Sequence, residues 1–149
     1  MAAITQTVNA RTALTVTGFG TLASATYVAS NIYTANTNKP LDVVVEVECA
    51  TGTAPTGNKQ IIVYVQESLD GTNFRSGPTS GASDTDRANL RFMGVIPMNT
   101  ITVTQRGTFS VAGALGYCPH SFKVVIKNDL GVALTSGAVY TAEISSSVV

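Results

Sequence analysis

The chain of 149 residues has no tryptophan and one histidine, and only 12% of its residues are charged. Nine Lys and Arg offset nine Asp and Glu, so the formal net charge is zero, and no electrostatic attraction to nucleic acid or to an anionic membrane is expected. The longest apolar runs, Val43 to Val45 and Ile61 to Val65, are far shorter than the roughly 18 residues that a membrane helix needs. The first ten residues also lack the features of a secretory signal. We therefore expect neither nucleic acid nor a membrane among the partners.

Cysteine is almost as scarce, and its spacing argues against a metal centre. The two cysteines are Cys49 and Cys118, and neither stands in a Cys-x-x-Cys or related ligand spacing. Cys49 continues the alternating apolar set of a predicted strand, whereas Cys118 lies between a tyrosine and a proline. Two free, buried thiols are the favoured interpretation, and a disulfide between them stays open as the alternative.

Hydroxyl and apolar side chains are abundant: 33 residues are Thr or Ser, and 44% of the chain is hydrophobic. This mixture favours strands and turns over helices, and the length suits one domain with a real core. Apolar and polar residues alternate over residues 41–49 and again over 60–67, with the turn-rich segment 51–58 between them. These two segments are predicted to form an antiparallel hairpin.

Weaker alternating segments bring the total to eight or nine short strands, separated by turn residues. Such a chain is predicted to be all-β, an antiparallel two-sheet sandwich, most simply a jelly roll. An immunoglobulin-like sandwich is the competitor, although its core Trp and bracketing cysteine pair are missing. The side chains expected between the two sheets are those of Val43, Val45, Val47, Ile61, Val63, Val65, Phe122, Val124 and Ile126.

The predicted domain organisation is an extended N-terminal arm, residues 1–11, followed by a single sandwich domain, residues 12–149. The arm is polar and weakly periodic, so it would be mobile unless it docks on something. Residues 75–89 also lack any large apolar side chain, and loops of this length in compact domains are usually functional or disordered. At most one short helix is expected, within residues 83–93, where a weak capping pattern occurs.

No catalytic constellation is evident. His120 is the only candidate imidazole base, and no Gly-x-Ser-x-Gly motif accompanies it. A dyad with Cys118 would require a favourable geometry across the intervening Pro119. Glu46 and Glu48 share one strand face, as the carboxylates of a glycosidase would, but a solvated strand explains them better.

Acidic residues in turns raise the separate question of calcium. Asp70, Asp84 and Asp86 could offer oxygen ligands, but no EF-hand spacing or dense acidic run supports such a site. We therefore predict a protein that is not an enzyme and that has no catalytic, cofactor-binding or metal-binding residues.

The segment Asn58 to Phe74 is a predicted strand that runs into a Ser-Leu-Asp-Gly-Thr-Asn-Phe turn, and residues 40–47 fit the same pattern. These segments resemble small structural proteins encoded beside the major capsid protein in tailed bacteriophages. The resemblance implies a head decoration, or cement, protein of jelly-roll type on the capsid exterior of the virion, made in the host cytoplasm. Its implied partners are the major capsid protein and copies of itself. That family has no catalytic residues to carry over. The alternative is a glycan-binding β-sandwich module of a phage tail or cell surface.

Three groups of residues are candidates for such an interface. The arm offers two apolar anchors and unpaired backbone for strand addition to a neighbour, and the loop 75–89 offers polar contacts. The outer strand faces offer an apolar stripe that a second subunit, the arm or a capsid surface could cover, and the alternative is that a sheet of the same chain covers it. The candidates are Ile4 and Val8 in the arm, Val44, Ile62 and Tyr64 in the stripe, and Arg75, Asp84, Asp86 and Arg87 in the loop.

Overall fold

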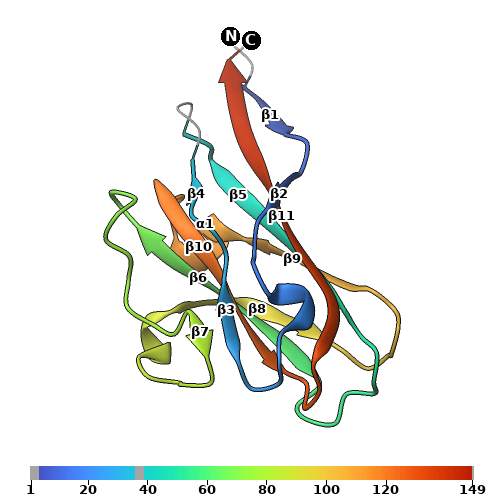
Figure 1. Cartoon of the computed structure of the whole chain (residues 1–149). Coiled ribbons are helices and arrows are strands. Elements are labelled where there is room, and N and C mark those ends of the chain that lie inside the picture. Colours follow the sequence, from blue (N-terminus) through green and yellow to red (C-terminus); the bar gives the residue numbers. More distant parts are fainter. Residues whose placement is uncertain (1–3, 36–38, 149) are drawn as a thin grey trace.

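Two antiparallel sheets face each other in the computed structural model, which describes residues 4–35 and 39–148 (Figure 1). The first sheet has the order β1-β11-β5-β9, with β2 also paired to β11, and the second has the order β7-β3-β10-β6-β8, with β4 also paired to β10. The strands of the first sheet are β1 (Ile4–Val8), β2 (Thr12–Leu14), β5 (Asp42–Thr51), β9 (Gln105–Ser110) and β11 (Leu134–Val148). Those of the second are β3 (Tyr27–Ala29), β4 (Tyr33–Thr34), β6 (Gln60–Ser68), β7 (Ser80–Gly81), β8 (Arg91–Pro97) and β10 (Ser121–Asp129).

The order of pairing is that of a jelly roll. The first strands, β1 and β2, pair with the last strand, β11, and the next two, β3 and β4, pair with the last but one, β10. Further inward, β5 pairs with β9, and β6 pairs with β8. The chain is therefore folded as one long hairpin wrapped across two sheets, and the predicted all-β sandwich of jelly-roll type is confirmed.

The core lies between the sheets and follows the alternation of the strands. In β5, Val43, Val45 and Val47 are fully buried, while the residues between them are only half-buried. All nine side chains expected between the sheets are fully buried. Phe19 and Met98 add to this core from outside the strands, and both are fully buried. A large-to-Ala change at such a site costs about 2–5 kcal/mol, because it removes apolar contacts and leaves a cavity.

The predicted hairpin of residues 41–49 with 60–67 is wrong. The strands β5 and β6 lie in opposite sheets, β5 between β11 and β9, and β6 between β10 and β8. Their apolar faces meet across the core rather than side by side. The connection of residues 52–59 is long enough to cross from one sheet to the other, and alternation alone does not distinguish a sheet partner from a partner across the core.

The expected helix was also misplaced. The helical part of residues 83–93 is the 3-10 turn η2 (Arg87–Asn89), which is followed by the start of β8, and a second 3-10 turn, η1, covers Phe19–Thr21. The α-helix α1 (Val111–Leu115) lies outside the segment in which a helix was expected. Its ends carry ordinary capping chemistry: the Ser110 hydroxyl accepts from the Gly113 N–H, and Gly116 ends the helix in the left-handed region. No helix in the described residues is long and apolar enough to cross a membrane.

Candidate interaction surface

Strand β1 and the end of β11 form a two-stranded ribbon that projects from the sandwich (Figure 1). Strand β5 accompanies β11 only as far as Ile144, whereas β1 pairs with Ile144 through Val148. Beyond Ile144, β1 and β11 therefore pair only with each other among the residues that the structure describes. We call Ile4–Val8 with Ile144–Val148 the terminal ribbon.

The two faces of the terminal ribbon differ in chemistry. Directly paired residues share a face, and the pair Val8 with Ile144 continues the outer face of the first sheet together with Ile4. Ile4 is 74% exposed and Val8 67% exposed. The opposite face carries hydroxyl groups alone, from Thr5, Thr7, Ser145 and Ser147. One face thus carries Ile4, Val8 and Ile144 with the polar pair Gln6 and Ser146 between them, and the other is a Thr and Ser ladder.

The outer edge of β1 is open in the described part of the chain, since β1 is the first strand of its sheet. The Asn9 N–H donates to the Glu143 carbonyl at 2.9 Å, and this bond shows which residues of β1 direct their backbone groups toward β11. Because bonding direction alternates along an antiparallel strand, residues 5 and 7 also bond toward β11, and residues 4, 6 and 8 point their N–H and C=O groups to the open edge. Residues 4–8 contain no charge and no proline, the usual devices that protect an edge strand.

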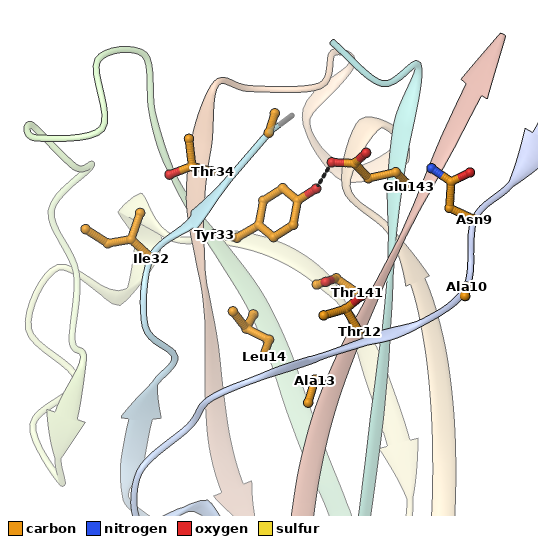
Figure 2. Close-up of a pocket in the computed structure, with 11 residues that line it drawn as sticks. Asn9, Ala10, Thr12, Ala13, Leu14, Ile32, Tyr33, Thr34, Thr141 and Glu143 are labelled. Atoms are coloured by element: carbon orange, nitrogen blue, oxygen red, sulfur yellow. Dashed lines mark hydrogen bonds between the residues drawn. The ribbon is translucent and has the colours of Figure 1, made fainter. Parts of the chain in front are cut away.

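A groove of about 630 Å³ lies at the base of the terminal ribbon, between β2 and β11 on one side and β4 on the other (Figure 2). Tyr33 reaches from β4 across the groove and donates a hydrogen bond to Glu143 of β11, so it links the two sheets. Its ring also stacks on Phe122 at 4.7 Å between ring centres. Burial, followed by the hydrogen bond to Glu143, raises the pKa of Tyr33 well above its ordinary value, so the hydroxyl stays protonated and acts as a donor. The hydrogen bond from Tyr33 to Glu143 thus ties the base of the terminal ribbon to the second sheet.

Cys118 and His120 line a neighbouring pocket but are not arranged as a nucleophile and its base. The Cys118 thiol has a sulfur contact to the Pro119 carbonyl at 4.0 Å, and His120 is exposed. Burial, and then the carboxylates of Asp42 and Glu143, raise the pKa of the Cys118 thiol, so the thiolate needed for attack is disfavoured. Cys49 is fully buried, and burial raises its pKa to about 12. Both cysteines are free, as the favoured interpretation held, although Cys118 is only partly buried.

The predicted apolar stripe of Val44, Ile62 and Tyr64 does not exist as one surface. Val44 lies on the first sheet, while Ile62 and Tyr64 lie on the outer face of the second sheet. Tyr64 is 8% exposed and belongs to a small cluster outside the main core. That cluster consists of Tyr27, Tyr64, Leu90 and Val125, with Ala29 and Ile62 packed against it. The stripe was inferred from the hairpin that the structure shows to be wrong. The part of it on the second sheet, Ile62 and Tyr64, packs in a cluster of the chain itself.

Ion pairs hold the loop 75–89 against the second sheet. The Arg75 Nε lies 2.6 Å from a carboxylate oxygen of Glu67, and the Lys127 Nζ lies 3.0 Å from Asp84. Asp84 also accepts a hydrogen bond from Tyr27 and lies 3.9 Å from Arg87. These contacts hold the loop against its own domain. The sequence prediction missed this attachment because the anchoring Leu90 falls just after the polar run.

Asp86, the remaining member of the polar interface set, is exposed and occupies the left-handed region with φ 58° before η2. Glu46 and Glu48 of β5 are each engaged in an ion pair with an arginine. Arg11 pairs with Glu46, and the Arg106 Nε lies 2.7 Å from Glu48, as on a solvated strand face. In the described residues no group of three acidic, histidine or cysteine side chains is placed to hold a metal ion.

These features define a jelly-roll domain with a projecting, unprotected strand pair. No protein-family model and no curated protein sequence matches the chain. Among solved structures, the chain is similar to a structure of infectious bursal disease virus, Gx strain, with a TM-score of 0.44 and 11% identity over 97% of this chain and 32% of that one. It is also similar to the infectious bursal disease virus VP2 subviral particle, with a TM-score of 0.24 and 13% identity over 98% of this chain and 42% of that one.

The chain thus spans less than half the length of these viral chains. At such TM-scores and identities, the jelly-roll assignment rests on the strand pairing of the chain itself.

Proposed function

We propose that this chain is a structural virion protein that decorates and stabilises a bacteriophage capsid from outside, by binding the major capsid protein and copies of itself. The observation that carries the proposal is the terminal ribbon, which offers exposed apolar side chains and an unprotected strand edge away from the sandwich core. The jelly roll is a common architecture of viral structural proteins. The resemblance of residues 58–74 to phage head proteins adds support.

The ribbon suits contact with a large lattice for a physical reason. Ile4 and Val8 are both largely exposed at the two ends of β1, and burying each fully against a partner contributes about 1.5–3 kcal/mol. The resembling segment has a different role. It is β6 and its turn, in which Asp70 accepts bonds from the Thr72 and Asn73 N–H groups at 2.8 Å, so it forms a rigid corner of the body.

The test is sedimentation with empty capsids of the phage that encodes the chain. Ile4→Ser should weaken co-sedimentation at least tenfold without changing the melting temperature, because Ile4 contributes little to the core. Leu69→Ser is the matched control, since Leu69 is 76% exposed on the body and Ile4 74% exposed on the ribbon. Equal binding by both variants and by the wild type would remove the ribbon as the contact, and no binding by the wild type would overturn the proposal.

A glycan-binding module is the second candidate, and one observation favours it. An open pocket of about 460 Å³ is lined by Glu67, Asp70, Asn73, Arg75 and Tyr117. Tyr117 is 44% exposed, and an aromatic face beside planar polar groups suits the faces and hydroxyls of a sugar ring. Retention of the wild type on a glycan array, lost in Tyr117→Ala, would favour this function over capsid binding.

A further inference from the structure

We propose that β1 adds to β1 of a second copy of this chain, antiparallel and centred on Gln6, so that the two terminal ribbons join in one four-stranded sheet. The proposal names a partner for the open edge described above. It deepens the proposed function by specifying how copies of the chain bind one another. It does not require a capsid, so it can fail or succeed independently.

The sequence of β1 is complementary to itself. Residues 4–8 read Ile-Thr-Gln-Thr-Val, which is nearly the same in both directions. Antiparallel pairing about Gln6 sets Ile4 opposite Val8 of the second copy, Thr5 opposite Thr7, and Gln6 opposite Gln6. Every residue thus meets one of its own chemical kind, on its own face of the sheet. A two-fold contact requires this kind of self-complementarity, because the same surface serves both partners.

The backbone N–H and C=O groups of β1 point in the directions that this register needs. Residues 4, 6 and 8 point their N–H and C=O groups to the open edge, as the bond from Asn9 to Glu143 implies. In the proposed register these same residues oppose each other, so both Gln6 residues exchange bonds and each Ile4 exchanges bonds with a Val8. A register shifted by one residue would pair outward-pointing groups with inward-pointing ones and lose the ladder.

The geometry also leaves room for both bodies. The sandwich follows the C-terminal end of β1, and antiparallel strands place the two C-terminal ends at opposite ends of the joined sheet. No charged side chain lies in residues 4–8, so no like charges meet across the axis. The apolar side chains of Ile4, Val8 and Ile144 from both ribbons then lie on one face, together with Gln6 and Ser146, and this face stays available to a capsid. The hydroxyl side chains of Thr5, Thr7, Ser145 and Ser147 lie on the other face.

Cysteine cross-linking tests the register directly. In the proposed dimer the Cα atoms of the two Gln6 residues are about 5.5 Å apart, within the range of a disulfide. The two Thr5 residues are offset by two positions and lie about 8 Å apart, which is too far. In a Cys118→Ser background, Gln6→Cys should oxidise to a covalent dimer, and Thr5→Cys should not. Thr5→Cys mixed with Thr7→Cys should cross-link as a heterodimer.

A proline variant supplies the second measurement. The Gln6 N–H points to the open edge, so Gln6→Pro should keep the bonds between β1 and β11 while blocking the second copy. Light scattering should show the wild-type mass halved in Gln6→Pro, with the melting temperature of the dilute protein unchanged. Thr7→Pro is the control, because Thr7 bonds toward β11 and its loss should detach β1 from the domain.

Several outcomes would overturn the proposal. They are equal cross-linking of Gln6→Cys and Thr5→Cys, no cross-linking by Gln6→Cys, or a mass unaffected by Gln6→Pro. Capsid co-sedimentation of Gln6→Pro is measured separately. Retained capsid binding by a monomeric Gln6→Pro would leave the proposed function standing with a single ribbon as the contact, whereas a wild-type dimer that binds no capsid would overturn the function and leave the dimer.

Discussion

Substitution of Tyr64 tests whether the outer face of the second sheet is covered by the chain itself or by a second subunit. In the structure it lies beneath the loop 75–89, 8% exposed, in a cluster with Tyr27, Leu90 and Val125. Directly opposite in β8, Phe92 makes an edge-to-face contact with it at 6.1 Å and is 58% exposed. The two aromatic residues are therefore neighbours in different surroundings, and they form a natural pair of variants.

The expected magnitude follows from this difference in burial. Replacing a buried aromatic side chain with alanine costs about 3–5 kcal/mol, and Tyr64 belongs at the lower end because its cluster is small and lies under a loop that can adjust. About 3 kcal/mol corresponds to a fall in melting temperature of about 6–12 °C for a domain of this size. Phe92→Ala should cost less than about 1 kcal/mol, since more than half of its ring already contacts water.

Urea denaturation followed by far-ultraviolet circular dichroism measures both costs, since the chain has no tryptophan to report by fluorescence. Trypsin digestion supplies a second readout, because Tyr64→Ala should loosen the loop and speed cleavage at Arg87. Light scattering should show the same mass for Tyr64→Ala as for the wild type. If Tyr64→Ala were as stable as the wild type but lower in mass, Tyr64 would be an intersubunit residue and the assignment of the loop as its cover would be wrong.

Three further predictions concern packing, pH and the absence of catalysis. Gly137→Ala should cost about 1–3 kcal/mol in urea denaturation, because the added Cβ would lie 2.7 Å from the buried Phe19 ring. Backbone N–H bonds from Asn73 and Thr72 lower the pKa of Asp70, so its stabilising contribution is present above the ordinary carboxyl pKa near 4 and is lost as pH falls through the folded value. The melting temperature of Asp70→Asn should therefore lie below that of the wild type at pH 7, and the gap should narrow as the pH falls below about 4. His120→Ala should leave capsid co-sedimentation and melting temperature unchanged, and lost binding at an unchanged melting temperature would identify a site that the structure does not suggest.

The sequence was sufficient for the fold class and the core but not for the partners of each strand. Alternation in residues 41–49 and 60–67 identified which side chains turn inward, since a strand buried on one face must repeat every two residues. It could not identify strand neighbours, because an inward-facing valine of β5 is equally compatible with a strand beside it and with a strand across the core. The nearest strand in sequence was chosen, whereas β5 pairs with β9 and β11.

The candidate interface residues show the same division. Ile4 and Val8 were singled out because they are the apolar residues of a polar arm, a local property that the sequence carries. The attachment of the loop 75–89 to the second sheet depends on Lys127 and Glu67 from distant strands, and no local pattern in the loop indicates those ion pairs. The palindromic order of residues 4–8 was visible in the sequence, but it acquires meaning only once the structure shows which edge of β1 is open.

The pairing of the first strands with the last also sets the order of events during synthesis. Among the described residues β1 pairs with β11 alone, so the terminal ribbon cannot form before β11 has left the ribosome. Folding that depends on contacts between the two ends of a chain is slow, and unpaired strands exposed meanwhile are prone to aggregate. An uncharged β1 is tolerable in this setting because a lone strand of five residues has little stability of its own. The terminal ribbon, and with it the ordered open edge of β1, thus forms only after β11 has been made.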